Sequence, residues 1–209
     1  MNRVRDLYQK MLKKYGKQGW WPVIRNSESR YHPGDYAVPN SNDEKFQIAV
    51  GAILAQNTNW KNAEKALLNL YKAGMLKPEK LKNASEAEIA NLIRSSGYYN
   101  QKSRKLKEFI KHYSSLTGRN SVASLREKLL SIRGLGPETA DSIILYAFKK
   151  PIFVVDTYTK RFCSAHDFPV SGDYDDYREF FEDNLRKDHK IFNEYHALIV
   201  RWGKDNKLK

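Results

Sequence analysis

Apolar residues recur along most of the chain at the three- and four-residue spacing of helices. Such stripes predict helices over five stretches: 63–71, 89–93, 106–113, 177–185 and 195–202. Gly74 and Gly118 follow two of these stripes, where a helix is expected to end. Ser85 and Glu88 have the spacing of a capping box, which predicts that a helix starts there, before the stripe at 89–93. The pattern therefore predicts an all-α fold.

Two segments depart from this simple amphipathic pattern. The segment KFQIAVGAILAQN, residues 45–57, is apolar on nearly all sides, so we expect a helix buried among other helices. The stretch from Pro22 to Pro39 is rich in helix breakers and follows two tryptophans. It is predicted to be a long loop, and long loops in compact domains often carry functional residues.

The charge of the chain narrows the choice of partners. Its 209 residues allow one domain or two small packed lobes. Lys and Arg number 37 against 24 Asp and Glu, which gives a net charge of +13 spread along the whole chain. Such an excess attracts polyanions, of which nucleic acid is the commonest, although a lysine-rich surface without a partner is the plain alternative.

Several kinds of protein are disfavoured by the residues that are missing. Cys163 is the single cysteine, so this chain alone forms neither an internal disulfide nor a cysteine-based metal or iron–sulfur site. His189 and His196 lack an identifiable carboxylate partner and are interpreted as surface or packing residues, and we expect no cofactor and no metal. No signal-peptide core and no run of about 18 apolar residues is present. We therefore expect a cytoplasmic, nucleoid-associated protein without a membrane partner, and a monomer by default.

The stretch LLSIRGLGPETADSIILYA contains the first candidate for chemistry. An apolar helix end runs into Arg133, Gly134, Leu135 and Gly136, and a second helix is predicted to start at Pro137. Backbone N–H groups beside a helix N-terminus favour a phosphate group. On its own this pattern is equally consistent with an ordinary connection between two helices.

A longer constellation resembles a known family. The Gly-Leu-Gly turn with Thr139, a helix of about three turns, and Asp156 placed 18 residues after Glu138 resemble the helix–hairpin–helix and aspartate signature of the endonuclease III superfamily of DNA glycosylases. The segment AVGAILAQNTNW resembles the family helix whose glutamine enters the gap left by an extruded nucleotide, with Gln56 in that place. SSGYYNQKSRKL resembles another family segment, with Ser103 where alanine is usual. Against the resemblance, Asp156 could simply cap the following helix.

The resemblance implies a fold and a division into lobes. We expect a two-lobed, all-α helix–hairpin–helix DNA glycosylase fold with the active-site cleft between the lobes. One helical lobe would span residues 45–150 and carry the hairpin, and residues 1–44 with 151–209 would build the second lobe from both termini. The segment HALIVRWGKDNK resembles the helix before the family's iron–sulfur loop, but the four cysteines of that loop are absent.

The resemblance also implies a reaction. Asp156 takes the place of the catalytic aspartate, and Glu138 stands where bifunctional members carry the lysine that forms a Schiff base, so a monofunctional glycosylase without lyase activity is expected. The similar subgroup is the bacterial 3-methyladenine DNA glycosylases of endonuclease III type. We therefore expect excision of alkylated purines from duplex DNA in base excision repair. The alternatives are an oxidised, deaminated or mismatched base on the same fold, or a DNA-binding module without catalysis, which would not need Asp156.

Further site residues follow from the same resemblance. The predicted catalytic pair is Asp156 and Glu138, and the predicted base pocket consists of Trp20, Pro22, Trp60 and Lys204. The residues predicted to contact DNA are Gln56, Arg133, Gly134, Leu135, Gly136 and Thr139.

Plainer interpretations of some residues are a packing role for Trp21, a favourable first-turn position for Glu138, and a solvated side chain for Lys204. Because Trp60 follows Gln56 by four residues, about one helical turn, the two side chains are expected side by side. The acidic segment SGDYDDYREFFEDN is expected to be a solvated helix face away from DNA.

Overall fold

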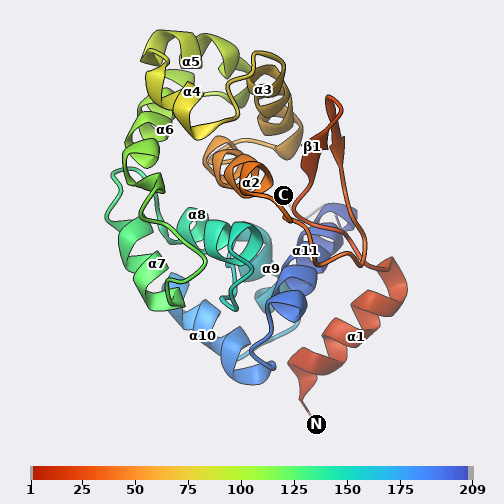
Figure 1. Cartoon of the computed structure of the whole chain (residues 1–209). Helices are drawn as coiled ribbons and strands as arrows, with labels where there is room; N and C mark the ends of the chain where they lie inside the picture. The colour runs from red at the N-terminus through yellow and green to blue at the C-terminus, as the bar shows by residue number, and fades with distance from the viewer. Residues whose placement is uncertain (1, 207–209) are drawn as a thin grey trace.

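The computed structural model describes residues 2–206 (Figure 1). The first part of the chain forms α1 (Arg3–Tyr15), β1 (Val23–Arg25), β2 (Glu28–Arg30), α2 (Asn42–Leu54), α3 (Trp60–Lys72), α4 (Pro78–Asn83), α5 (Glu86–Leu92) and the 3-10 turn η1 (Arg94–Ser96). The second part forms α6 (Tyr99–Tyr113), α7 (Val122–Leu130), α8 (Pro137–Ser142), the π-helical turn η2 (Ile143–Ala147), α9 (Thr157–Ala165), α10 (Tyr174–Asn184) and α11 (His189–Asp205). The predicted all-α class is confirmed, since the described strands form a single two-stranded hairpin.

Helix α2 lies at the centre of the fold. Ser41 starts the helix, because its hydroxyl accepts a hydrogen bond from the N–H of Glu44. Every residue from Phe46 to Leu54 is buried, and the helix packs against α3, α6, α8, η2 and β1. Each large apolar side chain buried in this way contributes about 1.5–3 kcal/mol. The predicted buried helix is confirmed.

Of three predicted helix boundaries, one start and one end are confirmed, and one end is shifted. Ser85 and Glu88 form a reciprocal capping box at the start of α5, and Gly74 follows α3 with a φ of +68°. The predicted end of α6 at Gly118 is wrong, because the helix ends at Tyr113. The chain then tightens into a turn that buries Leu116 against the core.

The stretch from Pro22 to Pro39 is not a simple loop. Strands β1 and β2 form an antiparallel hairpin in which Val23 pairs with Arg30. Its turn is made by Asn26 and Ser27, which both adopt a positive φ, of 53° and 63°. Because neither turn residue is a glycine and each strand has three residues, the usual hairpin signal is absent from the sequence.

The first helix of the chain packs against the last two. Helix α1 packs against α10 and α11, where the rings of Tyr8 and Tyr195 lie 5.1 Å apart and the Tyr195 hydroxyl donates to the Val4 carbonyl. Helices α3 to α6 form a separate group on the other side of α2 (Figure 1). The fold is thus two-lobed, while lobe boundaries after residues 44 and 150 stay a prediction. None of the described helices is long and apolar enough to cross a bilayer.

Candidate active site

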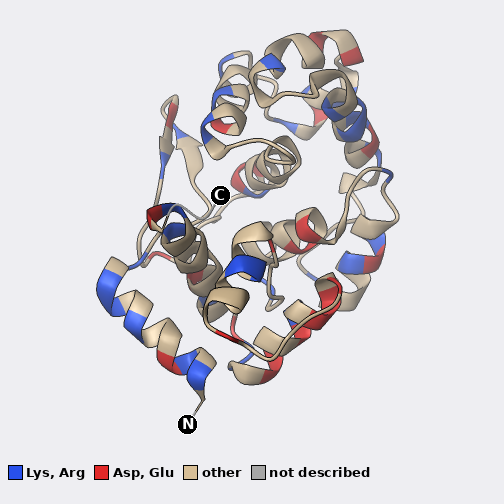
Figure 2. Cartoon of the chain, turned by 180° about the vertical axis from the view of Figure 1, so that it is seen from behind, with Lys and Arg blue, Asp and Glu red and all other residues tan. Residues whose placement is uncertain are grey.

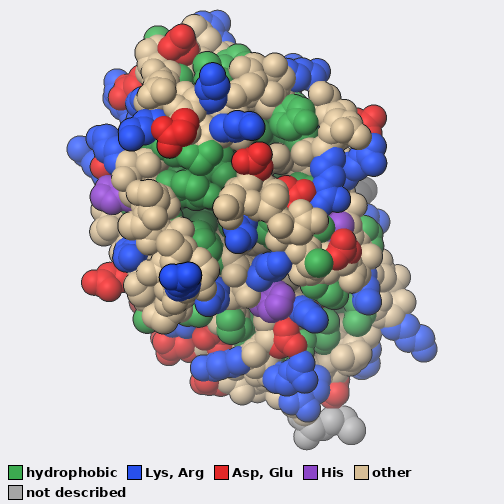
Figure 3. All heavy atoms as spheres, in the orientation of Figure 1, with side chains coloured by type: hydrophobic (Ala, Val, Ile, Leu, Met, Phe, Trp, Pro, Cys, Tyr) green, Lys and Arg blue, Asp and Glu red, His purple; other side chains and the backbone are tan. Residues whose placement is uncertain are grey.

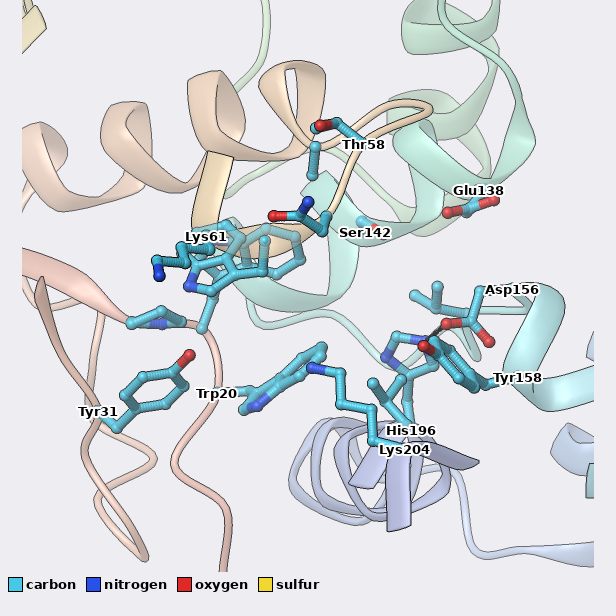
Figure 4. A pocket seen from close by; sticks show the side chains of 17 residues that line it. Trp20, Tyr31, Thr58, Lys61, Glu138, Ser142, Asp156, Tyr158, His196 and Lys204 are labelled. Atoms are coloured by element: carbon cyan, nitrogen blue, oxygen red, sulfur yellow. Dashed lines mark ion pairs between the residues drawn. The ribbon is translucent and has the colours of Figure 1, made fainter. Parts of the chain in front are cut away.

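A cavity of about 640 Å³ opens between the two groups of helices (Figure 4). Its wall is built by the segment after α1, the β-hairpin region, the start of α3, the first turns of α8, the start of α9 and the second half of α11. Six residues predicted from the sequence line it: Trp20, Pro22, Trp60, Glu138, Asp156 and Lys204. Residues far apart in the sequence therefore meet at one site.

Asp156 is both a helix cap and a cavity residue. Its Oδ1 accepts hydrogen bonds from the backbone N–H of Thr159 at 2.8 Å and from the Thr159 hydroxyl at 3.0 Å, which starts α9. Its Oδ2 lies 3.5 Å from Nε2 of His196. The two interpretations of Asp156 are compatible, because each carboxylate oxygen has its own partner.

The surroundings of Asp156 favour its ionised form. Burial alone would raise its pKa, because it removes water from the carboxylate. The His196 ring and the two donors of Thr159 outweigh burial and hold the pKa of Asp156 below its usual value. Asp156 is therefore negatively charged at neutral pH, as a group that stabilises positive charge must be.

Glu138 occupies the first turn of α8 and faces the same cavity. The helix dipole favours a carboxylate at this position. The Glu138 side chain is exposed at the cavity, and the protein around it removes part of its water. This partial desolvation, followed by the negative charge of Asp156, raises the pKa of Glu138, and a positive charge on His196 would oppose the rise. Glu138 takes up a proton more readily than Asp156, although its chemical role stays a prediction.

Aromatic side chains form much of the cavity wall. Trp21 is 8% exposed and packs edge-on against Trp60 and Tyr146, with ring centroids 5.2 Å from each, so the structure shows the packing role expected for it. Trp20 and Trp60 are half-buried and line the cavity. Tyr31, which is 45% exposed, also lines it and was not predicted. Its position follows from the β-hairpin, which the sequence pattern missed.

Two lysines stand among the cavity residues. Nζ of Lys204 lies 6.0 Å from the ring centroid of Trp20, which is within the range of a cation–π contact. Lys61, in the first turn of α3, also lines the cavity. Figure 4 shows both side chains on the side where Trp20 and Tyr31 lie, with Glu138 and Asp156 across the cavity. The site thus has cationic and anionic sides.

Gln56 lies outside this cavity and contacts the hairpin instead. Its side-chain amide donates to the Gly134 carbonyl at 3.2 Å and to the Thr139 hydroxyl at 2.8 Å, and Lys105 donates to its Oε1 at 2.7 Å. The expected helical spacing between Gln56 and Trp60 is wrong, because α2 ends at Leu54 and α3 starts at Trp60. The intervening turn directs the two side chains to different places.

The hairpin between α7 and α8 has two buried residues, Ile132 and Leu135, and four exposed ones. Arg133, Gly134 and Gly136 are exposed, whereas Leu135 is 5% exposed and belongs to the hydrophobic core. A DNA contact by Leu135 is therefore restricted to its backbone. Gly134 has a φ of +92°, and a Cβ there would lie 2.8 Å from Cε of Lys105. The backbone conformation of this turn requires glycine, and an added Cβ would also displace the Lys105 side chain.

His196 packs in the core against Trp20 and Tyr146, which agrees with one of the two expected alternatives, but it also faces Asp156, which was not expected. Its side chain is buried in α11, Nδ1 lies 2.6 Å from the Tyr146 hydroxyl, and Nε2 faces Asp156. The available sequence signal was a histidine within the apolar run HALIV, at a position where the helical stripe faces the core. Its carboxylate partner lies 40 residues earlier, so spacing could not identify it.

The acidic segment around α10 is more than a solvated face. Asp175 binds Arg126 of α7 at 2.5 Å and Arg178 at 3.0 Å, while Arg126 also binds the fully buried Asp141 of α8 at 3.0 Å. Figure 2 shows the acidic residues gathered along α10. The expected solvated face is present, since Asp173, Asp176, Glu179 and Asp183 are exposed, but Asp175 also ties α10 to the helices of the hairpin through Arg126.

The remaining surface carries charge of both signs. Lys and Arg side chains are distributed over the face seen in Figure 3, with Asp and Glu among them. Across residues 2–206, no three His, Cys, Asp or Glu side chains gather as metal ligands would.

The fold and the site together define a helix–hairpin–helix DNA glycosylase architecture. Residues 50–187 match the model of the HhH-GPD superfamily of base excision DNA repair proteins. A Methanocaldococcus jannaschii protein, named provisionally as a DNA repair glycosylase, is 41% identical over 94% of this chain and 85% of its own length. The chain therefore belongs to the HhH-GPD superfamily and is a DNA glycosylase of base excision repair.

Solved structures agree with this fold. The H. pylori 3-methyladenine DNA glycosylase bound to 1,N6-ethenoadenine superposes with a TM-score of 0.72 at 25% identity, covering 97% of this chain and 94% of that one. A trapped endonuclease III–DNA covalent intermediate superposes with a TM-score of 0.75 at 18% identity, covering 97% and 85%. At 18% identity, the endonuclease III structure supports the fold alone.

Proposed function

We propose that the protein excises alkylated purines such as 3-methyladenine from duplex DNA and leaves an abasic site. The observation that carries the proposal is the ionised Asp156 at a cavity lined by Trp20 and Trp60. Cleavage of the N-glycosidic bond develops positive charge on the deoxyribose. The Asp156 carboxylate would stabilise that charge and orient or deprotonate the attacking water.

An alkylated purine suits such a cavity. A purine alkylated at N3 or N7 carries a positive charge and leaves without protonation by the enzyme. Electron-rich rings bind a cationic base with roughly 0.5–2 kcal/mol per good contact, and Trp20, Trp60 and Tyr31 offer such rings. The likeness to a 3-methyladenine DNA glycosylase over nearly the whole chain supports the same substrate class.

Base excision requires the duplex to be opened and held. We propose that Gln56 leaves its hydrogen bonds to Gly134 and Thr139 and fills the space of the extruded nucleotide. The exposed residues Arg133 and Gly136 would then contact the phosphate backbone next to the N-terminus of α8. One copy of the chain contains every element that this proposal uses, so we propose a monomer.

We also propose that the enzyme lacks AP lyase activity. Strand cleavage by this fold family proceeds through a lysine after the hairpin, and Glu138 occupies that position. A carboxylate cannot form a Schiff base with the sugar. Glu138 would instead add negative charge to the cavity beside Asp156.

A second candidate substrate is an oxidised or deaminated base. Lys61 and Lys204 line the cavity, where an ammonium group repels a cationic base and donates hydrogen bonds to a carbonyl oxygen. Such a base is neutral and carries an additional carbonyl. The two substrates therefore make opposite demands on these lysines.

The test is a comparison of damaged bases with the wild-type protein. Duplexes carrying 3-methyladenine, 7-methylguanine, hypoxanthine, 8-oxoguanine or a thymine mismatch are incubated separately, and the released base is quantified. The proposal predicts release of the alkylated purines, with no covalent adduct trapped by borohydride. Preferred release of a neutral base would support the second candidate, and a trapped adduct would contradict monofunctional action.

A further inference from the structure

Tyr146, His196 and Asp156 form a line of polar groups that runs from the core to the cavity. Tyr146 belongs to η2 and is 2% exposed, and its hydroxyl lies 2.6 Å from Nδ1 of His196. Nε2 of His196 lies 3.5 Å from Oδ2 of Asp156. His196 itself is 4% exposed, and the ring of Trp20 lies edge-on 5.8 Å from it. Water therefore has little access to the histidine.

The Tyr146 hydroxyl decides which nitrogen of His196 carries the proton. Burial raises the pKa of Tyr146 well above its usual value, so the hydroxyl keeps its proton. Within residues 2–206 this hydroxyl hydrogen-bonds to Nδ1 of His196 and to nothing else. A buried donor left without an acceptor costs about 1–3 kcal/mol, so Tyr146 donates and Nδ1 accepts. The proton of the neutral ring is then on Nε2, which faces Asp156.

The other protonation states fit this geometry poorly. With the proton on Nδ1 alone, the Tyr146 hydroxyl would lose its acceptor and the lone pair of Nε2 would face the Asp156 carboxylate. With both nitrogens protonated, the positive ring would lower the pKa of Asp156 and of Glu138 by its charge, but the hydroxyl would again lose its acceptor. In each case the buried Tyr146 hydroxyl is left without an acceptor, whereas Nε2–H, which has no hydrogen-bond partner at the present 3.5 Å separation, gains one by a small shift toward Oδ2.

We propose that His196 is a positioning residue for Asp156. As a neutral ring with Nε2–H, it donates toward Oδ2 and fixes the carboxylate between Thr159 and the cavity, and Tyr146 fixes the tautomer of His196. This inference rests on the proposed function, because it assigns the orientation of the carboxylate that stabilises the sugar cation. His196 does not need to contact the substrate.

The electrostatic consequence concerns the ionisation of Asp156. The other titratable groups around the pair come from several elements: Tyr31 after β2, Lys61 of α3, Glu138 of α8, Tyr146 of η2, Tyr158 of α9, and Lys204 of α11. When His196 no longer donates, burial acts on the Asp156 pKa with only the two donors of Thr159 to oppose it. The Asp156 pKa then rises, and the acidic limb of the excision rate moves to higher pH.

Four variants separate this role from simple packing. His196→Leu removes the donor, His196→Gln keeps an N–H donor, and Tyr146→Phe removes the group that fixes the tautomer. His189→Gln is the matched control, because its partially exposed side chain lies in the first turn of α11, about two turns before His196. Each variant is checked for folding by thermal melting and for affinity to an abasic-site duplex.

Two readouts are measured. The first is single-turnover excision across pH, where His196→Leu should shift the acidic limb upward by about one pH unit. His196→Gln should restore most of the wild-type profile, and His189→Gln should match it. The second is NMR of the free protein, in which the His196 ring nitrogens should show a protonated Nε2 and an unprotonated Nδ1. The Asp156 carboxyl carbon should titrate at higher pH in His196→Leu.

The outcomes distinguish this inference from the proposed function. A proton on Nδ1 of His196, or an unchanged Asp156 titration in His196→Leu, would overturn the positioning role whatever the substrate is. If the wild type releases no alkylated base, the proposed function fails while the NMR result still decides the role of His196. If His196→Leu does not fold, Tyr146→Phe and the tautomer measured in the wild type decide it.

Discussion

The buried Lys102 should make the protein more stable as the pH rises from 7 to 9.5. This lysine of α6 is 2% exposed, and its ammonium group donates to the carbonyls of Leu54 at 2.8 Å and Ser96 at 2.6 Å. It thereby ties the end of α2, just before Gln56, to η1. Burial, followed by the positive charge of Lys105, lowers the pKa of Lys102 to about 8.

The sign follows from the protons bound by each state. An unfolded lysine has a pKa of about 10.4, so between pH 8 and that value the unfolded chain keeps a proton that the folded chain has lost. The free energy of unfolding therefore rises with pH in this window. From pH 7 to pH 9.5 the rise attributable to Lys102 is about 2 kcal/mol. Methionine has a similar length and does not titrate, so Lys102→Met should lack this gain.

The assay is urea denaturation at pH 7 and pH 9.5 of the wild type, Lys102→Met and Lys111→Met. Lys111 is an exposed residue of the same helix and serves as the control for removing a lysine. The difference in stability between the wild type and Lys102→Met should change by about 2 kcal/mol between the two pH values in favour of the wild type. Equal pH dependence of these two proteins would refute the reasoning, because it would mean that the buried lysine stays protonated.

Two further predictions concern the base pocket and the hairpin. Trp60→Ala should slow the excision of cationic alkylated bases by roughly tenfold while leaving the binding of undamaged duplex nearly unchanged, because it removes an aromatic wall of the cavity; an equal loss of both would contradict a pocket role. Gly134→Ala should weaken DNA binding and destabilise the protein by about 1–2 kcal/mol, because its φ is +92°. Gly136→Ala is the control, since its φ is −90° and no atom lies within 4 Å of an added Cβ. Equal effects of the two substitutions on stability would show that backbone strain is not the cause.

Local sequence patterns predicted much of the fold. The apolar run of α2, the capping box of Ser85 and the proline that starts α8 each depend on neighbours within a few residues, and each is present in the structure. The β-hairpin was missed for the same reason. Its turn residues, Asn26 and Ser27, adopt positive φ values without the glycine that usually announces such a turn.

The site was predictable where the family resemblance covered it. The resemblance placed residues as far apart in sequence as Trp20, Asp156 and Lys204 at one pocket, and all three line the cavity. Tyr31 and His196 were missed because their positions depend on packing between distant elements. A buried histidine satisfied by Tyr146 on one side and facing Asp156 on the other has no local sequence signature.

The measurement that tests the account most directly is single-turnover release of 3-methyladenine from duplex DNA by the wild type and by Asp156→Asn, with duplex affinity measured for both. Asparagine keeps the size of the side chain and an oxygen for the cap of α9 but removes the negative charge. We expect the wild type to release the base, and Asp156→Asn to lose excision while retaining DNA affinity. Excision by Asp156→Asn at the wild-type rate, or an equal loss of binding and excision, would contradict the role assigned to Asp156.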